Sequence, residues 1–235
     1  MKLGSPRYIV LLADSAVEFI PREIWSHPAV AAYCQRRGKS PARTLLDSSY
    51  HHAAMRGLPS GERRGRPDIL HFTILEVLGS PLNKAGKLGV YIHTQSGHLI
   101  WVNPKVRLPR NYDRFKSLFE KLMAEKVIES DTGEVLLSVL NSDLSSWVDG
   151  IGAGSVILLS ENGVQVEMKM LGEASKSPKP VIFIIGCFPH GDFSPEVRSI
   201  ADREVRISEY TLDAWVAASR ILCLLELAEA KNKPE

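Results

Sequence analysis

A strongly apolar segment that ends in a glycine-bounded turn is the clearest candidate ligand site in this sequence. Residues 181–185 are all apolar, and the turn that follows lies between Gly186 and Gly191. In open α/β sheets, ligands bind beyond the carboxyl ends of the strands, where glycines let the backbone approach a cofactor. An ordinary strand-to-helix turn is the simpler explanation of this segment taken alone. The sequence has no G-x-G-x-x-G or G-x-x-x-x-G-K-[ST] motif, so nucleotide di- and triphosphates are not supported as ligands.

Two other groups of reactive side chains are weaker candidates. Cys187 and His190 lie in the same turn and invite a nucleophile-and-base interpretation, but a small buried cysteine explains the pattern more simply. His51, His52 and His71 have no companion ligands at metal-binding spacing. We therefore expect no metal site.

A basic loop is the second candidate site. Arg107, Arg110 and Arg114 follow one another at intervals of three and four residues, and Asn111 is suited to cap a helix that begins beside them. The N-terminus of a helix attracts anions, and guanidinium groups placed there bind phosphate well. Without an anion, these arginines would be repelled by the positive end of the helix. We therefore favour phosphate binding over a solvated surface.

The formal net charge of +2 is unevenly distributed. Residues 36–66 contain eight Arg and Lys against two acids, and residues 105–116 contain five against one. Together these stretches carry +10, so the remainder carries −8. Such segregation is expected of a face that binds a polyanion. A solvated surface loop would explain the first stretch equally well.

Composition indicates a globular chain. The 235 residues are 44% hydrophobic, which is enough for a buried core. No run approaches the roughly 20 apolar residues of a membrane span, and the N-terminus lacks a signal-peptide pattern. The three cysteines are odd in number, far apart and never in a Cys-x-x-Cys pair. We expect a cytoplasmic protein with reduced thiols.

The elements that must position these residues alternate between strand and helix. Apolar runs predict strands at residues 8–13, 88–93, 99–103, 135–140, 156–160 and 181–185. Helical spacing and capping residues predict helices at 27–37, 41–47, 68–77, 111–126 and 212–230. Turns are expected at 95–97, within a hairpin, and at Asn162-Gly163. This alternation favours an α/β fold with a mostly parallel sheet.

The last of these helices is apolar on nearly all sides, through Trp215, Ile221, Leu222 and Leu225 among others. A helix of this kind must be covered both by its own sheet and by something else. A second subunit is a plausible cover, and this predicts a symmetric homodimer.

Several short motifs in order together resemble one enzyme family. They are Arg66-Pro67-Asp68-Ile69, Ser80-Pro81-Leu82-Asn83 with Ala85-Gly86, residues 90–94, Asn103-Pro104, and residues 107–115, 186–191 and 207–210. In this order and spacing the chain resembles the small-subunit ribosomal RNA pseudouridine-N1-methyltransferases, a branch of the SPOUT, or trefoil-knotted α/β, methyltransferases. The resemblance extends from about Arg66 to the last helix.

The resemblance implies a fold and an activity. It implies one SPOUT-like domain over residues 1–235, with a knotted, mostly parallel sheet flanked by helices. A basic RNA-binding insertion is expected around residues 36–66 and a cofactor-binding knot around 150–230. The implied enzyme is a homodimer that uses S-adenosylmethionine to methylate ring nitrogen N1 of a pseudouridine in 16S/18S-type RNA during ribosome biogenesis.

Site residues follow from the resemblance by position. The cofactor-binding loops are expected to include Gly186, Gly191, Ile207, Ser208, Glu209, Tyr210, Thr211 and Leu212. The RNA-binding residues are expected to be Arg66, Arg107, Arg110 and Arg114. Arg66 and Asp68 are expected to act in catalysis, where Asp68 either takes the proton from the ring nitrogen or orients Arg66; we favour orientation.

Two alternatives stay open. The chain departs from the family before Arg66 and over residues 144–177, including Gly152-Ala153-Gly154, so the first cofactor-side loop is not assigned. A related enzyme acting on transfer RNA or on a ribose 2′-hydroxyl would fit the same motifs. An RNA-binding ribosome assembly factor in which methylation is secondary would fit them as well.

Overall fold

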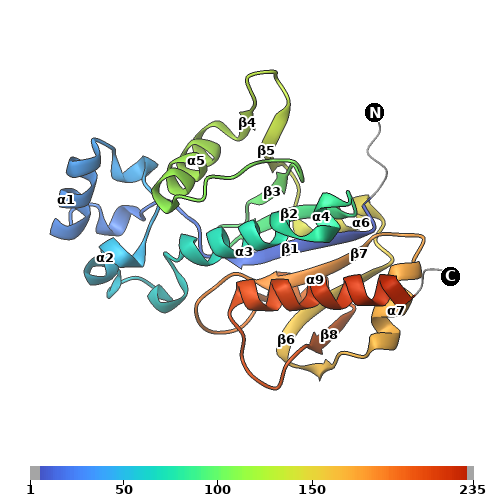
Figure 1. The fold of residues 1–235 in the computed structure, drawn as a ribbon. Helices are drawn as coiled ribbons and strands as arrows, with labels where there is room; N and C mark the ends of the chain where they lie inside the picture. Colours follow the sequence, from blue (N-terminus) through green and yellow to red (C-terminus); the bar gives the residue numbers. More distant parts are fainter. Residues whose placement is uncertain (1–5, 232–235) are drawn as a thin grey trace.

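A twisted sheet forms the centre of the computed structural model, which describes residues 6–231 (Figure 1). Within these residues the strand order is β4-β5-β3-β2-β1-β7-β6-β8. The strands are β1 (Tyr8–Ser15), β2 (Leu88–Thr94), β3 (Leu99–Val102), β4 (Val127–Glu129), β5 (Val135–Leu140), β6 (Ser155–Gln165), β7 (Val181–Gly186) and β8 (Arg203–Arg206). The first five residues, which bear on the predicted absence of a signal peptide, lie outside the described range.

The sheet has a parallel body and an antiparallel wing. Strands β2, β1, β7, β6 and β8 pair in parallel, so their carboxyl ends meet at one edge. Strands β3, β5 and β4 continue the sheet in antiparallel pairs, beginning with the predicted hairpin between β2 and β3. Every residue of β1 is buried because the strand lies between β2 and β7. This explains its continuous apolar run and confirms a mostly parallel α/β fold.

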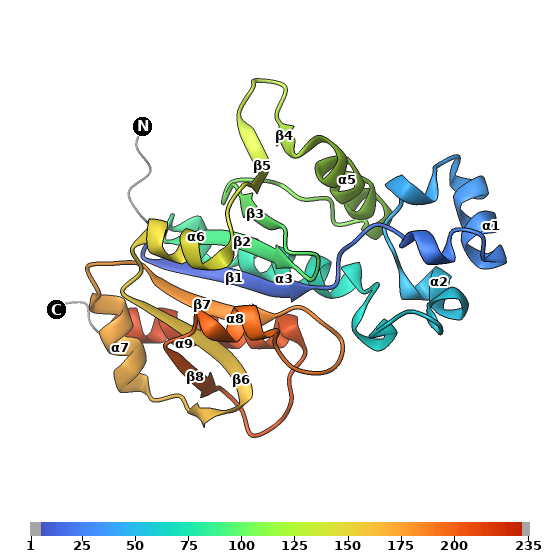
Figure 2. The ribbon, with the colours of Figure 1, turned by 180° about the vertical axis from the view of Figure 1, so that it is seen from behind.

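Helices cover both faces of the sheet (Figures 1 and 2). On one face lie α3 (Pro67–Gly79), α4 (Pro81–Lys84), α7 (Met168–Lys176) and α9 (Ala214–Lys231). On the other lie α6 (Leu144–Ile151) and α8 (Pro195–Ser199). Each face buries its own hydrophobic cluster against the sheet. Helix α5 (Tyr112–Glu125) packs on the antiparallel wing, and Asn111 caps it as predicted by accepting a hydrogen bond from the Arg114 amide at 3.0 Å.

Residues 19–63 form a small helical lobe beside the sheet (Figure 1). The lobe contains α1 (Pro28–Arg37), α2 (Ser48–Met55) and 3-10 turns at Arg22–Ile24, Pro41–Arg43 and Gly61–Arg63. Its side chains, among them Ile20, Val30 and Leu46, form a hydrophobic cluster of their own. The lobe contains most of the predicted basic insertion and starts well before it.

The last helix supports the dimer prediction less than expected, because three of its four named apolar side chains are covered within the chain and only Trp215 is half-buried. Ile221, Leu222 and Leu225 are buried inside the single chain, at 0–2% exposure. Helices α3 and α7 and the sheet cover them, because α9 lies between these elements. Only a part of the helix remains open, including Leu227, which is 51% exposed.

Two local predictions also fail. Residues 41–47 contain only the 3-10 turn, and α2 begins after Asp47, whose carboxylate accepts a hydrogen bond from the Ser49 amide at 3.0 Å. Asn162-Gly163 is not a turn, because β6 continues to Gln165 through a bulge. Elements that are short or weakly patterned were missed altogether, namely β4, β8, α2, α4, α6, α7 and α8. No helix among the described residues is both long and apolar enough to span a membrane.

Candidate functional site

A cavity of about 450 Å³ lies at the carboxyl edge of the parallel strands. Three segments that are distant in the sequence build it: the bulge of β6 (159–162), the turn after β7 (185–193) and the loop from β8 into α9 (206–215). Ile69 and Arg66 at the start of α3 close it on another side. This volume is in the range of small-molecule and cofactor pockets, and the site lies where ligands bind in open parallel sheets.

The predicted cofactor-binding residues meet at this cavity. It is lined by Gly186, Gly191, Ile207, Ser208, Tyr210, Thr211 and Leu212. Glu209 is not among the lining residues, since the short turn at 208–210, where the Ser208 hydroxyl accepts from the Tyr210 amide, sets it aside. The structure therefore brings together two loops that the sequence separates by more than a dozen residues.

The two glycines are required for different reasons. A Cβ on Gly186 would lie 2.7 Å from the Phe188 ring, so no side chain fits there. Gly191 has φ +85°, a conformation that L-residues with side chains rarely adopt. A Cβ on Gly191 would meet the side chain of Arg63 at 3.4 Å. A larger residue at 191 would thus strain the backbone and press on Arg63.

The part of the cavity wall that β6 forms was not predicted from the sequence. Leu159 and Val164 both pair with Val205, so the residues between them leave the strand ladder as a bulge. Bulges commonly redirect side chains beside active sites. A Cβ on Gly163 would lie 2.5 Å from the backbone of β8, so the Asn-Gly pair that predicted a turn marks a close backbone approach. The bulge places Glu161 in the cavity wall.

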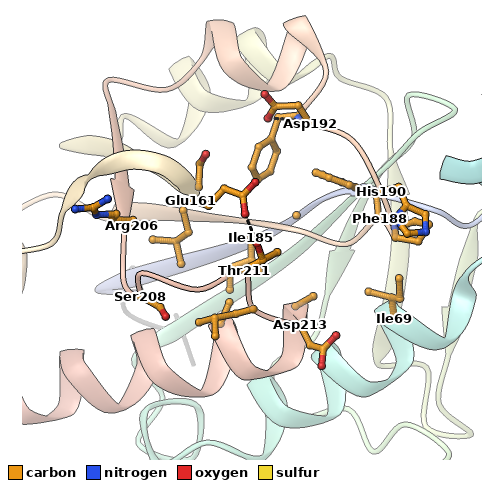
Figure 3. A pocket seen from close by; sticks show the side chains of 18 of the residues that line it. Ile69, Glu161, Ile185, Phe188, His190, Asp192, Arg206, Ser208, Thr211 and Asp213 are labelled. Carbon is orange, nitrogen blue, oxygen red and sulfur yellow. Dashed lines mark hydrogen bonds between the residues drawn. The ribbon is translucent and has the colours of Figure 1, made fainter.

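Glu161 and the loop before α9 meet across the cavity. The Thr211 hydroxyl donates a hydrogen bond to the Glu161 carboxylate, which Figure 3 shows in the middle of the site. Ile69 and His190 lie on one side of this pair, and Arg206 lies on the other. The cavity therefore combines apolar walls with one carboxylate near its centre.

Arg66 and Asp68 form an ion pair at the edge of the cavity. The guanidinium donates two hydrogen bonds to the two carboxylate oxygens, at 2.9 and 2.8 Å. These hydrogen bonds to Asp68 raise the pKa of Arg66 further. Pro67 occupies the first turn of α3, so both charged residues are fixed at the N-terminus of that helix. Arg66 lines the cavity and Asp68 stands behind it.

The basic loop between β3 and α5 is tied to the same helix. His71 on α3 donates a hydrogen bond from Nε2 to the carbonyl oxygen of Pro109 at 2.8 Å. The side chains of Arg107, Arg110 and Arg114 are exposed around this anchor. The structure thus places the loop arginines and Arg66 on neighbouring parts of one helix-and-loop unit.

A buried ion pair joins α5 to the helical lobe. Lys116 and Asp47 lie 2.7 Å apart, each with only 1% of its side chain exposed. The Tyr112 hydroxyl donates to the same Asp47 oxygen at 2.9 Å, and the rings of Tyr50 and Tyr112 face the Lys116 ammonium at 4.6 and 4.4 Å. Although burial alone would lower it, the Asp47 carboxylate raises the pKa of Lys116 overall. Lys116 is therefore a structural cation, unlike the exposed arginines beside it.

The remaining candidates do not form a reactive group. Cys187 is fully buried, and burial raises the pKa of its thiol to about 12, which excludes a thiolate nucleophile at neutral pH. His190 is exposed at the cavity rim. Among residues 6–231 no group of three or more His, Cys, Asp and Glu is arranged to hold a metal ion.

Comparison with known proteins gives consistent matches along nearly the whole chain. Residues 10–226 match the family described as EMG1/NEP1 methyltransferase. The chain is 42% identical over 222 residues to the ribosomal RNA small subunit methyltransferase Nep1 of Staphylothermus marinus, covering 94% of this chain and 96% of that protein. It is 43% identical over 213 residues to Nep1 of Methanothrix thermoacetophila, covering 91% and 92%.

A solved structure is similar as well. The crystal structure of Archaeoglobus fulgidus Nep1 bound to S-adenosylhomocysteine superposes with a TM-score of 0.86 at 39% identity. The match covers 95% of this chain and 99% of that one.

Proposed function

Because the chain belongs to the EMG1/NEP1 methyltransferase family, we propose that it methylates small-subunit ribosomal RNA in the cavity at the carboxyl edge of its sheet. This membership confirms the family resemblance inferred from the sequence. The observation that carries the assignment is spatial. Arg66, which is predicted to bind RNA, lines the same cavity that the predicted cofactor-binding loops form.

The cavity suits S-adenosylmethionine, which supplies an electrophilic methyl group when bound. Ile185, Ile207 and Leu212 provide apolar surface for an adenine ring, and the Glu161 carboxylate can accept hydrogen bonds from ribose hydroxyls. Gly186 and Gly191 allow the close packing and the positive φ that give this turn its course along the cavity. The related Archaeoglobus structure was solved with the demethylated product of this cofactor.

The chain's own residues have mainly to hold and align the RNA. We assign Arg107, Arg110 and Arg114 to phosphate contacts, because they are exposed beside the N-terminus of α5. Alignment of the reacting atoms can itself contribute on the order of 7–11 kcal/mol to catalysis. The target base must leave its stack to reach the cavity.

Asp68 orients Arg66 in this proposal. Both of its oxygens already accept hydrogen bonds from one guanidinium. A carboxylate held in this way is suited to positioning its partner. Arg66, fixed by Asp68, then contacts RNA at the rim of the cavity.

We propose N1 of a pseudouridine as the methyl acceptor, following the family resemblance. The test is transfer of a labelled methyl group from S-adenosylmethionine to an RNA hairpin with one pseudouridine, with the product nucleoside identified by mass spectrometry. The same hairpin with uridine is the control, because N1 of uridine is bonded to the ribose. Label on N1 of pseudouridine alone is expected. Label on a ribose hydroxyl in both hairpins would contradict the proposal.

A homodimer is also proposed, now from exposed side chains on α3 and α9. Phe72 on α3 is 52% exposed and contacts the Trp215 ring of α9 at 5.5 Å between centroids, and Leu227 on α9 is half exposed. Apolar side chains exposed on adjoining helices are typical of a subunit contact. Light scattering should give a dimer mass, and Phe72→Asp should give a folded monomer. A monomer mass for the wild type would contradict this.

The cytoplasm is the proposed location, because the similar proteins named above are ribosomal RNA enzymes of archaea, which have no nucleus.

A further inference from the structure

Arg63, in the last turn of the helical lobe, reaches the turn that lines the cofactor cavity. Its guanidinium donates a hydrogen bond to the carbonyl oxygen of Asp192 at 2.5 Å. The same group lies over the ring of Phe188, 5.0 Å from its centroid. Phe188 and Asp192 both line the cavity. The Arg63 side chain therefore contacts both Phe188 and Asp192, which are the two ends of the stretch 188–192.

The backbone of Arg63 is itself fixed to the sheet. The Gln95 side chain donates to the Arg63 carbonyl oxygen at 2.8 Å, and the Gln95 amide donates to the Ser15 carbonyl oxygen at 3.1 Å. Arg63 is half-buried, in contrast to the exposed arginines of the basic loop. Its guanidinium is thus held between a rigid support and the turn.

Other contacts hold the turn on both sides of this stretch. The Cys187 amide donates to the Ala13 carbonyl oxygen at 2.8 Å, and the rings of Phe188 and Phe193 meet at 5.2 Å between centroids. Ser194 donates from its amide and its hydroxyl to Asp14, at 2.6 and 2.9 Å. Arg198 of α8 pairs with the Asp192 carboxylate at 2.5 Å. Between Phe188 and Asp192 the chain passes through Gly191 at φ +85°, directly beneath the Arg63 side chain. This stretch is the part of the turn that Arg63 covers.

We propose that Arg63 is a positioning residue for methyl transfer, which fixes residues 188–192 in the conformation that binds the cofactor. The inference rests on the proposed function, since it assumes that the cavity holds S-adenosylmethionine. It gives the helical lobe a second role: besides presenting basic residues to RNA, the lobe shapes the cofactor cavity.

A contact between Arg63 and RNA phosphate is the competing explanation, because Arg63 belongs to the basic stretch at residues 36–66. The two explanations differ when no RNA is present. An RNA contact predicts unchanged cofactor affinity for an Arg63 variant, whereas a positioning residue predicts weaker cofactor binding.

The experiment is calorimetric titration of the RNA-free protein with S-adenosylhomocysteine. Arg63→Met keeps the length of the side chain and removes the donor, and Arg63→Lys keeps a donor and removes the planar group over Phe188. Arg56→Ala is the matched control, because Arg56 is an exposed arginine of the same lobe. We expect at least a tenfold loss of affinity for Arg63→Met, a smaller loss for Arg63→Lys and none for Arg56→Ala.

Hydrogen exchange supplies a second readout that a general loss of stability would not reproduce. In Arg63→Met, the amides of residue 188 and of residues 190–193 should exchange faster while those of β7 stay protected. Wild-type affinity together with wild-type exchange in this turn would overturn the proposal. If Arg63→Met does not fold, the same comparison is made with Arg63→Lys. If the wild type does not bind S-adenosylhomocysteine, the proposed function fails, whereas the effect of Arg63 on the turn is still decided by exchange.

Discussion

The helical lobe and the cofactor side of the sheet are attached to the molecule by different kinds of contact. The lobe joins α5 through charged groups: Lys116 with Asp47, Arg37 with Asp113, and Lys39 with Glu120. Helix α9, by contrast, is held mainly by apolar packing against α3, α7 and the sheet, and its charged contacts within residues 6–231 are confined to Glu229 near its C-terminal end, which pairs with Lys87 and Arg7. The position of the lobe should therefore depend on protonation, and the cavity should depend on backbone conformation.

Loss of the buried cation should have the largest effect on stability. Lys116→Met leaves the Asp47 carboxylate buried without its partner, which costs roughly 3–5 kcal/mol of unfolding free energy. Lys121→Met is the control on the same helix, because Lys121 and Glu125 form an exposed pair that is worth about 1 kcal/mol or less. Denaturant unfolding of both variants measures the difference. Equal, small losses of unfolding free energy in the two variants would contradict the proposed dependence of the lobe on charged contacts.

Low pH should have the second-largest effect, because it should lower the stability of the helical lobe. Burial lowers the pKa of His51 from its ordinary 6.5 to about 4, so the folded chain keeps this ring neutral while the unfolded chain protonates it. The contribution of the neutral His51 ring to the free energy of unfolding is complete above about pH 6.5. It is lost as the pH falls toward 4. At about 1.4 kcal/mol per pKa unit, the loss is on the order of 3 kcal/mol.

This acid effect can be checked by unfolding at a series of pH values. His51→Gln should flatten the stability curve between pH 6.5 and 4, whereas His52→Gln, at the exposed neighbouring residue, should leave its slope unchanged. The same slope in the wild type and in His51→Gln would show that other groups control the acid response.

On the cofactor side, a strained backbone should affect binding more than stability. A branched residue at Gly191 cannot easily adopt φ +85°. Gly191→Val should weaken S-adenosylhomocysteine binding at least a hundredfold, or about 2.8 kcal/mol. Gly150→Ala is the control, since Gly150 has open space for a Cβ. Calorimetry with a folded Gly191→Val protein of unchanged affinity would contradict the role of this turn.

The smallest expected effect is on RNA binding. Arg107→Ala with Arg110→Ala should weaken RNA affinity roughly tenfold at low salt and flatten the slope of log affinity against log salt by roughly 0.7 per lost contact. Melting temperature and S-adenosylhomocysteine affinity should stay at wild-type values because both side chains are exposed. A lower melting temperature with weaker binding of both ligands would instead indicate a structural role.

The sequence predicted the parts of the fold that depend on local patterns. The buried strands and the cap at Asn111 follow from apolar runs and from one side-chain hydrogen bond. The burial of α9 within the single chain could not be predicted from the sequence. Its apolar faces are covered by α3 and α7, whose positions depend on the whole topology. The trefoil knot implied by the resemblance stays a prediction for the same reason.

The candidate site was predicted in two of its three segments. The loops near Gly186 and Thr211 have family motifs, and the structure places both at the cavity. Glu161 was missed because a bulge, created by the pairing of β6 with β8, places it there. The Asn162-Gly163 pair was the available signal, and it was interpreted as a turn because local sequence does not distinguish a turn from a bulge.

The central place of β1 also determines the order in which the protein can be built. The strand is made before both of its partners, and the partner β7 is made only after β2 to β6. Until then one edge of a largely apolar strand has no partner, and such edges promote aggregation in nascent chains. Contacts between distant parts of a chain also slow folding. The sheet must therefore close late, and a truncated chain that ends before β7 should depend on chaperones to stay in solution.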